Sequence, residues 1–131
     1  MKEKFKFEIF QNVGGRFTGN FISVTSAGFG FGAGFCQKYQ ILKQDYVVLH
    51  LARNKEQIII GFSFTKDGSL PGVFKLTKNN NSGFVGAHSF FNAYDINFNQ
   101  YGGRYTPNLY TDPRFGKLFV IELRKKMDGD E

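Results

Sequence analysis

The stretch Gly28-Phe29-Gly30-Phe31-Gly32-Ala33-Gly34-Phe35 best predicts how this chain folds, because its pattern of residues occurs twice. Together with Tyr39 and Ile41 it forms a pattern that returns 55 positions later (83 − 28 and 96 − 41). The second occurrence consists of Gly83, Phe84, Phe90, Tyr94 and Ile96. A repeated unit that is too small to bury its own apolar face must pack against its twin. The sequence therefore predicts one pseudo-symmetric core.

The flanking segments extend the repeat. Upstream, residues 22–26 are matched by residues 74–78 at a spacing of 52, so residues 79–81 (Asn-Asn-Asn) form a three-residue insertion. Downstream, residues 58–60 have a counterpart in residues 118–120. Chance similarity is the alternative, because Phe, Gly and Asn are abundant in this sequence. The matches give two copies, at approximately residues 20–65 and 73–123.

The alternation of Gly and Phe has several interpretations. In an extended chain the glycines line one face, and Phe29, Phe31 and Ala33 line the other. A glycine face often marks the close approach of another backbone or a ligand, and a bent strand leading into a helix is the alternative. Most of the 17 Phe residues are expected to fill the core, and a platform for stacked bases is the alternative for some in this stretch. The stretch is also a candidate edge that pairs with a partner or a second copy. It is not a dinucleotide-binding loop, since no long helix follows it.

Other patterns predict mainly strands. Residues 4–9 alternate charged and apolar side chains, which is the period of a half-buried strand. Residues 46–51 and 57–64 are apolar or β-branched and flank a polar turn at residues 53–56. This arrangement predicts a hairpin.

Two short helices are expected. Phe35, Tyr39 and Leu42 share one face of the first helix. In the second copy, Ser89 is expected to cap a helix that carries Phe90 to Tyr94.

The remaining segments are assigned as follows: a boundary between the copies at residues 66–72, a turn and strand at 101–105, a long polar loop at 106–116, a strand at 118–123 and a charged tail at 124–131. We therefore expect a single mostly-β (α+β) domain over residues 1–131. Its predicted architecture is a small pseudo-symmetric β-barrel, built from two ββαββ-like repeats with two short helices.

Composition limits the class of protein. The 131 residues suit one domain, and neither a membrane span nor a secretory leader is expected. The lone cysteine, Cys36, argues for a reducing, cytoplasmic location, and with only two histidines we expect no metal or other cofactor. The net charge of +6, from 17 basic and 11 acidic residues, favours a nucleic-acid partner. A compositional bias and simple solubility are the alternatives.

The first copy resembles the DNA-binding unit of the SpoVT/AbrB-type swapped-hairpin family. In that family a strand and a Gly-containing turn lead into a short helix with a Leu-Gly-Ile-like corner, and a hairpin with a charged tip follows. Here Tyr39-Gln40-Ile41 matches the corner, residues 43–49 take the place of the next turn and strand, and residues 53–56 match the tip. The family's Arg and Pro at the start of the helix are absent from residues 29–33. The resemblance implies a paired small barrel that binds duplex DNA in a regulatory role, usually as a dimer.

Basic residues fall into three groups that suit phosphate contacts. One group brackets the strand that opens the second copy, one flanks the long loop with its tyrosines, and one lies at the first hairpin tip. Basic groups beside exposed Tyr suit single strands, whereas Asn and Arg reaching from a barrel suit a duplex groove. A solvated loop is the alternative for each group. The candidate nucleic-acid-binding residues are Lys75 and Lys78, then Arg104, Arg114, Lys117 and Tyr105, then Arg53 and Lys55.

No catalytic site is expected. Cys36 fits a small core residue better than a nucleophile, and neither His50 nor His88 has a placed carboxylate partner. The first hypothesis is a non-catalytic protein that binds duplex DNA, with DNA favoured over RNA and a homodimer possible. The alternatives are a single-strand DNA or RNA binder of the Whirly-like type, and a protein-interaction or structural module of a virus or mobile element. Replacing both Lys75 and Lys78 with Ala is expected to weaken nucleic-acid binding.

Overall fold

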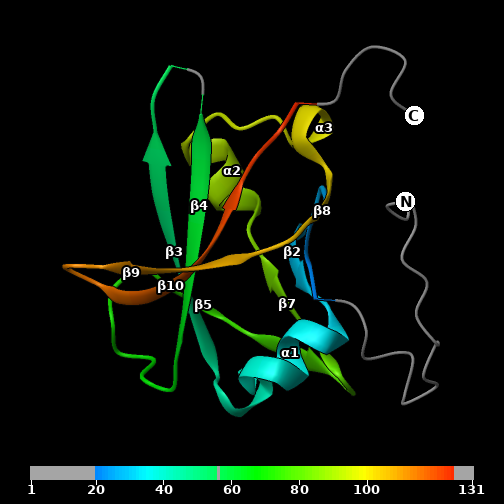
Figure 1. Cartoon of the computed structure of the whole chain (residues 1–131), viewed down its shortest axis with the longest axis vertical. Coiled ribbons are helices and arrows are strands. Elements are labelled where there is room, and N and C mark those ends of the chain that lie inside the picture. Colours follow the sequence, from blue (N-terminus) through cyan, green and yellow to red (C-terminus); the bar gives the residue numbers. More distant parts are fainter. Residues whose placement is uncertain (1–19, 56, 126–131) are drawn as a thin grey trace, which may run out of the picture.

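The computed structural model describes residues 20–55 and 57–125 of the chain (Figure 1). The predicted strand at residues 4–9 and most of the charged tail, residues 126–131, lie outside the described residues. The protein is mostly β, as predicted, with two five-stranded antiparallel sheets and a few short helices. Within the described ranges, no helix is long and apolar enough to cross a membrane.

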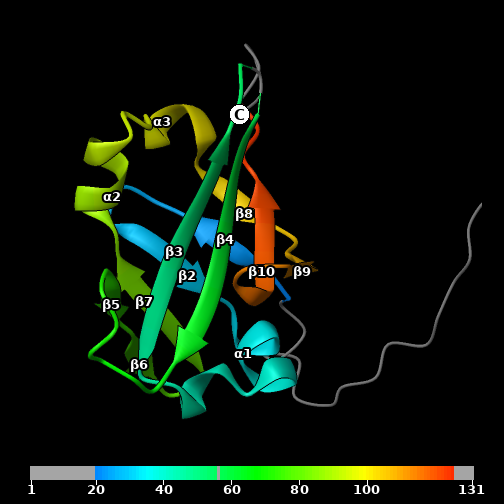
Figure 2. The same cartoon turned by 90° about the vertical axis from the view of Figure 1, so that its left-hand side faces the viewer.

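Both sheets mix strands from the two halves of the chain. The first sheet has the order β6 (Thr77–Asn79), β7 (Ser82–Gly86), β2 (Gly28–Phe31), β1 (Ile22–Val24), β8 (Gly103–Tyr105). The second sheet has the order β5 (Val73–Lys75), β3 (Tyr46–Arg53), β4 (Ile58–Thr65), β10 (Gly116–Glu122), β9 (Asn108–Asp112). Each sheet thus holds one hairpin from each half, and the sheets lie on either side of a common core (Figure 2).

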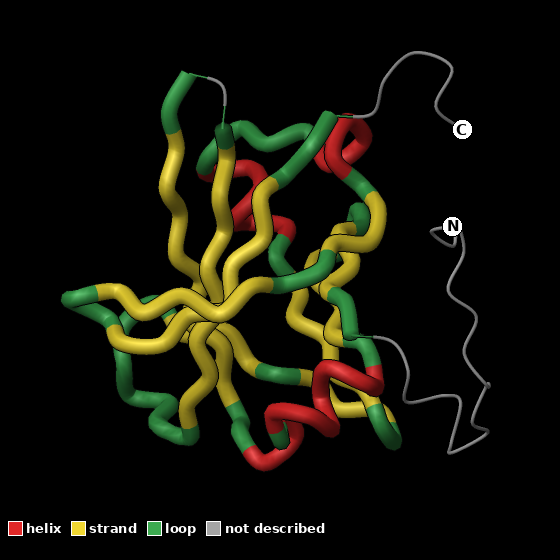
Figure 3. The backbone as a smooth tube through the Cα atoms, viewed as in Figure 1, coloured by secondary structure: helices red, strands yellow, loops and turns green. Residues whose placement is uncertain are grey.

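The helices lie at the two ends of the sheets (Figure 3). The elements are α1 (Ala33–Tyr39), the 3-10 helix η2 (Ile41–Lys43), α2 (His88–Ala93) and α3 (Phe98–Tyr101). The expected cap at Ser89 is wrong, because α2 begins at His88 with Ala87 at the N-cap position and no side-chain cap. The third α-helix was not predicted. Asn97 starts it, and its side chain accepts a hydrogen bond of 2.9 Å from the Asn99 N–H.

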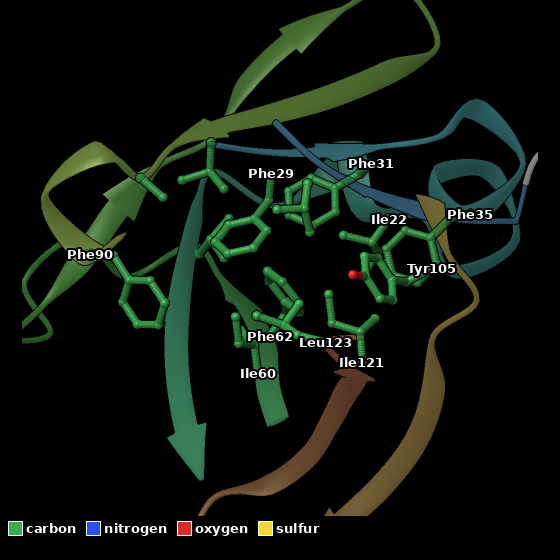
Figure 4. Close-up of a cluster of buried hydrophobic side chains, with 14 of the residues drawn as sticks. Ile22, Phe29, Phe31, Phe35, Ile60, Phe62, Phe90, Tyr105, Ile121 and Leu123 are labelled. Carbon is green, nitrogen blue, oxygen red and sulfur yellow. The ribbon is translucent and has the colours of Figure 1, made fainter. Parts of the chain in front are cut away.

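The Gly–Phe stretch forms the centre of the core. Phe29 and Phe31 of β2 are buried and point toward the second sheet (Figure 4). Their ring centroids lie 4.9 Å and 5.6 Å from that of Phe62 on β4, in edge-to-face geometry. Such pairs stabilise a core beyond the area they bury. The prediction that these rings form a platform for stacked bases is therefore wrong.

The glycine face of β2 allows a close approach of backbone, as one interpretation of the sequence predicted. Gly28 has a φ of +151°, and a Cβ atom added there would lie 2.0 Å from the Val85 carbonyl oxygen. β2 pairs with β1 on one side and with β7 on the other. Because both sides of the strand are occupied, the predicted pairing of this strand with a partner or second copy is wrong.

The expected long loop at residues 106–116 contains a strand instead. β9 pairs with β10 along its whole length, from Asn108 opposite Val120 to Asp112 opposite Gly116. The turn between them is held by the Asp112 carboxylate, which accepts hydrogen bonds from the Arg114 and Phe115 N–H groups at 2.7 Å and 3.1 Å. The two prolines lie just before the strand and in the turn, where a missing N–H group is tolerated.

The strand predicted at residues 74–78 is divided between the sheets. β5 and β6 are separated by one residue, the buried Leu76, and belong to different sheets. Asn79, the first residue of the predicted insertion at residues 79–81, belongs to β6 and pairs with Ser82. β8 and β9 likewise follow one another with two residues between them, and they too lie in different sheets.

Candidate nucleic-acid interface

Four cationic residues converge on a polar hollow of about 610 Å³ at one end of the second sheet. Arg53 and Lys55 come from the β3–β4 hairpin, and Arg124 and Lys125 follow β10. The described lining contains one acidic residue, Glu122. We call this feature the basic hollow; its remaining lining residues are Asn54, Gln57, Ile58, Tyr101 and Leu123.

Backbone and side-chain hydrogen bonds hold the two sides of the basic hollow together. The Leu123 N–H donates to the Ile58 carbonyl at 2.9 Å, which fixes the end of β10 beside β4. In the β3–β4 turn, the Gln57 N–H donates to the Asn54 side-chain oxygen at 2.8 Å. The Gln57 side-chain amide in turn donates to the Glu122 carboxylate at 3.1 Å. The acid in the lining is therefore engaged by a neighbouring amide.

Arg53 is oriented by a backbone carbonyl at the end of α2. Its Nη1 donates to the Tyr94 carbonyl, at the end of α2, with a distance of 2.8 Å. Since a guanidinium has five N–H donors in a rigid fork, fixing one of them orients the others. This geometry suits recognition of a phosphate oxygen.

Tyr105 has a different place from the one predicted. It was expected to be an exposed contact for nucleic acid, but it is only 4% exposed. Its hydroxyl donates to the Tyr101 carbonyl and accepts from the Arg124 N–H at 3.2 Å. The Arg124 guanidinium lies 5.1 Å from the centre of the Tyr105 ring. Tyr105 points into the core because side chains alternate between the two faces along β8. Its hydroxyl and its ring both contact Arg124 and so hold that residue in position.

Arg124 and Lys125 were not predicted as site residues, because they belong to the expected charged tail at residues 124–131. Both line the basic hollow. Nothing local in the sequence connects them with Arg53 and Lys55. The connection arises from the antiparallel pairing of β4 with β10, which places Ile59 opposite Glu122.

Lys75 and Lys78 lie away from the basic hollow, on β5 and β6 (Figures 1 and 2). The Lys78 Nζ is 2.9 Å from the Asp45 Oδ1, and both side chains are exposed. The hydrogen bond from Lys78 lowers the pKa of the Asp45 carboxyl, and the charges of Lys66 and Lys75 lower it further. Lys78 is therefore already paired with an acid.

The predicted group of Arg104, Arg114 and Lys117 is not a single cluster. Arg104 is on β8, where its guanidinium lies 4.4 Å from the centre of the Phe21 ring. Arg114 and Lys117 belong to the β9–β10 hairpin. The five residues of β9, at about 3.3 Å each, carry that turn away from β8, and Figure 1 shows the two on opposite sides of the molecule. Of the eight predicted residues, the structure brings Arg53 and Lys55 into the basic hollow.

Comparison of the chain with protein-family models, with curated proteins and with solved structures found no match.

Proposed function

We propose that this protein binds single-stranded nucleic acid, without catalysis, along its second sheet. The basic hollow carries this proposal: four cations face it, and the acid in its described lining is hydrogen-bonded to Gln57. Basic side chains that neutralise phosphates and release their counterions supply most of the affinity of a nucleic-acid-binding surface. A hollow with this excess of positive charge suits a sugar–phosphate backbone.

Exposed rings on the same sheet favour a single strand over a duplex. Tyr110 on β9 and Phe115 in the β9–β10 turn are 50% and 53% exposed. Single-strand binders combine a positively charged groove with aromatic side chains on which bases stack. The bases of a duplex are already stacked on one another and do not reach such rings. The duplex hypothesis rested on the resemblance to the swapped-hairpin family, whose Arg and Pro are absent here.

We further infer that the domain is a duplicated, closed barrel. The hairpins β1–β2 and β3–β4 have counterparts in the same order in β6–β7 and β9–β10, and α1 and α2 follow corresponding strands. In the β2–β7 ladder, Gly28 pairs with Gly86 and Phe31 with Gly83. A shift of 55 positions between the copies exchanges these two pairs, which supports a two-fold relation. The short links from β5 to β6 and from β8 to β9 support closure at both edges.

Fluorescence anisotropy with labelled single strands and duplexes across a salt series tests the proposed function. We expect the single strand to bind more tightly than the duplex, with a steep fall in affinity as salt rises. The variant Lys55→Ala/Lys125→Ala should bind roughly tenfold more weakly at low salt. A plot of the logarithm of its binding constant against the logarithm of salt concentration should have a slope that is smaller in magnitude by about 1.4, because each phosphate that is no longer neutralised contributes about 0.7.

The matched control is Lys75→Ala/Lys78→Ala, which removes the same charge from the other end of the molecule. We expect this variant to bind almost like the unchanged protein, because Lys78 is paired with Asp45. If Lys75→Ala/Lys78→Ala lowers the affinity more than Lys55→Ala/Lys125→Ala does, the binding site lies on β5 and β6 instead. Absence of binding to either kind of strand at low salt would contradict the proposal.

A further inference from the structure

A second hollow, of about 370 Å³, lies on the outer face of the second sheet, and most of its lining is apolar. Residues directly opposite one another on paired strands share a face. His50 on β3 and Val120 on β10 both lie opposite Gly61 on β4, and Leu118 lies opposite Tyr110. We call this feature the apolar hollow; it is lined by Ile59, Gly61, Leu118 and Val120, with His50, Tyr110 and Phe115 around them.

Gly61 allows neighbouring side chains to pack closely over β4 at the apolar hollow. It is buried and lies between His50 and Val120 in the row across the sheet. A Cβ atom added there would lie 3.2 Å from Leu118 Cδ1 and 3.5 Å from His50 Cβ. The Leu118 and His50 side chains therefore pack closely over Gly61, and apolar side chains form the floor of the hollow.

Aromatic and cationic groups border the apolar hollow. The rings of Phe115 and His50 are 4.8 Å apart, and the Arg114 guanidinium lies 5.0 Å from the centre of the Phe115 ring. The Asp112 carboxylate accepts the turn hydrogen bonds from Arg114 and Phe115, so it is engaged within the turn. His50 Nε2 is 3.1 Å from the Ser63 hydroxyl, and burial lowers the pKa of this imidazole, which keeps it neutral near pH 7.

The apolar hollow and the basic hollow follow one another along the same strands. On β3, Ala52 lines the apolar hollow and the next residue, Arg53, lines the basic one, so the two side chains leave the strand on opposite faces. On β4, Ile59 and Ile58 likewise lie on opposite faces, whereas on β10 Val120 and Glu122 line the two hollows from the same face. A ligand with an anionic backbone and planar apolar rings can therefore reach both hollows by following the outer face of β10.

We propose that the apolar hollow holds one unstacked base of the bound strand, with the base stacked on Phe115 and a neighbouring phosphate on Arg114. This inference rests on the proposed function. The volume is that of a small-molecule site, and its apolar floor beside a cation suits a nucleobase better than a free anion.

Binding of a thymidine oligonucleotide that carries 5-iodouracil tests the inference by affinity and by photocross-linking. Phe115→Ala should bind about 5- to 150-fold more weakly, the usual loss of one base–aromatic stack. The cross-linked residue, identified by mass spectrometry, should be Phe115 or Tyr110. Phe115→Tyr should bind like the unchanged protein, and Phe115→Leu should behave like Phe115→Ala, because leucine keeps the apolar bulk but cannot stack.

Leu109→Ala is the matched control. Leu109 is 52% exposed, as much as Phe115, but it lies opposite Phe119, on the other face of the β9–β10 hairpin. Its replacement should leave affinity and cross-linking unchanged. If Phe115→Ala binds normally and cross-links fall elsewhere, while Lys55→Ala/Lys125→Ala still weakens binding, the base site is wrong and the proposed function stands. If the unchanged protein does not bind the oligonucleotide, both proposals fall.

Discussion

Cys36 lies in α1, where it is 2% exposed and surrounded by core residues. Its thiol donates a hydrogen bond of 3.4 Å to the Phe31 carbonyl. Burial raises the pKa of the thiol from 9.0 to about 11, because the thiolate is poorly solvated inside the protein. The side chain acts as a small apolar core residue, in agreement with the interpretation of the sequence.

This shift makes the stability of the protein sensitive to alkaline pH. The folded thiol keeps its proton up to about pH 11, whereas the unfolded thiol ionises near 9.0. The stabilisation is therefore complete below pH 9 and is lost as the pH rises toward 11. Between pH 8 and pH 10.5, the free energy of unfolding in urea should fall by about 2 kcal/mol more for the unchanged protein than for Cys36→Ala. Equal losses in the two proteins would mean that the thiol ionises normally.

At the scale of one element, β2 depends on the absence of a side chain at a single glycine. Gly28 and Gly86 lie directly opposite each other in the β2–β7 ladder. A Cβ atom at Gly28 would lie 2.0 Å from the Val85 carbonyl oxygen and 2.8 Å from the Ala87 nitrogen. At Gly86 the nearest atom would be the Ala27 carbonyl oxygen, at 3.9 Å, which is an ordinary contact.

Gly28→Ala should therefore destabilise the protein strongly, by roughly 3 kcal/mol or more, because two backbones must move apart and the residue is strained at its φ of +151°. Gly86→Ala, the matched control, should change the free energy of unfolding by less than about 1 kcal/mol. Chemical denaturation of both variants makes the comparison. Similar stabilities would show that β2 and β7 separate at little cost.

Sequence patterns predicted elements well where one face is buried. The β3–β4 hairpin was predicted close to its observed limits because Val47, Ile58, Ile60 and Phe62 are all buried. β9 was missed because four of its five residues are exposed, so its sequence shows no alternation of apolar and polar residues. The candidate site was predicted only in part for a related reason. Arg53 and Lys55 lie near each other in the chain, whereas Arg124 joins them through long-range strand pairing.

At the scale of the whole molecule, both halves of the chain contribute strands to each of the two sheets and side chains to the core. The ladders β2–β7 and β4–β10 join the halves in both sheets. The core crosses the same boundary: the Phe29 ring lies 4.9 Å from that of Phe62 in its own half and 5.2 Å from that of Phe91 in the other. The linking segment, residues 66–72, is exposed at every position. One exposed segment therefore links the two halves in sequence, whereas strand pairing and a shared core join them in the folded protein.

A protease site inserted between residues 68 and 71 should consequently be cut without loss of structure. The cut protein should elute as one species on gel filtration and keep its β-type circular dichroism, because the two ladders and the core hold the halves together.

After separation in denaturant, neither half should show cooperative unfolding alone, since β2 and β4 would each become an edge strand with apolar side chains exposed. Mixing the halves should restore the fold, and with it the binding of single strands, because the basic hollow takes Arg53 and Lys55 from one half and Arg124 and Lys125 from the other. Cooperative folding of either half by itself would show that its core is self-sufficient, which would contradict the shared core.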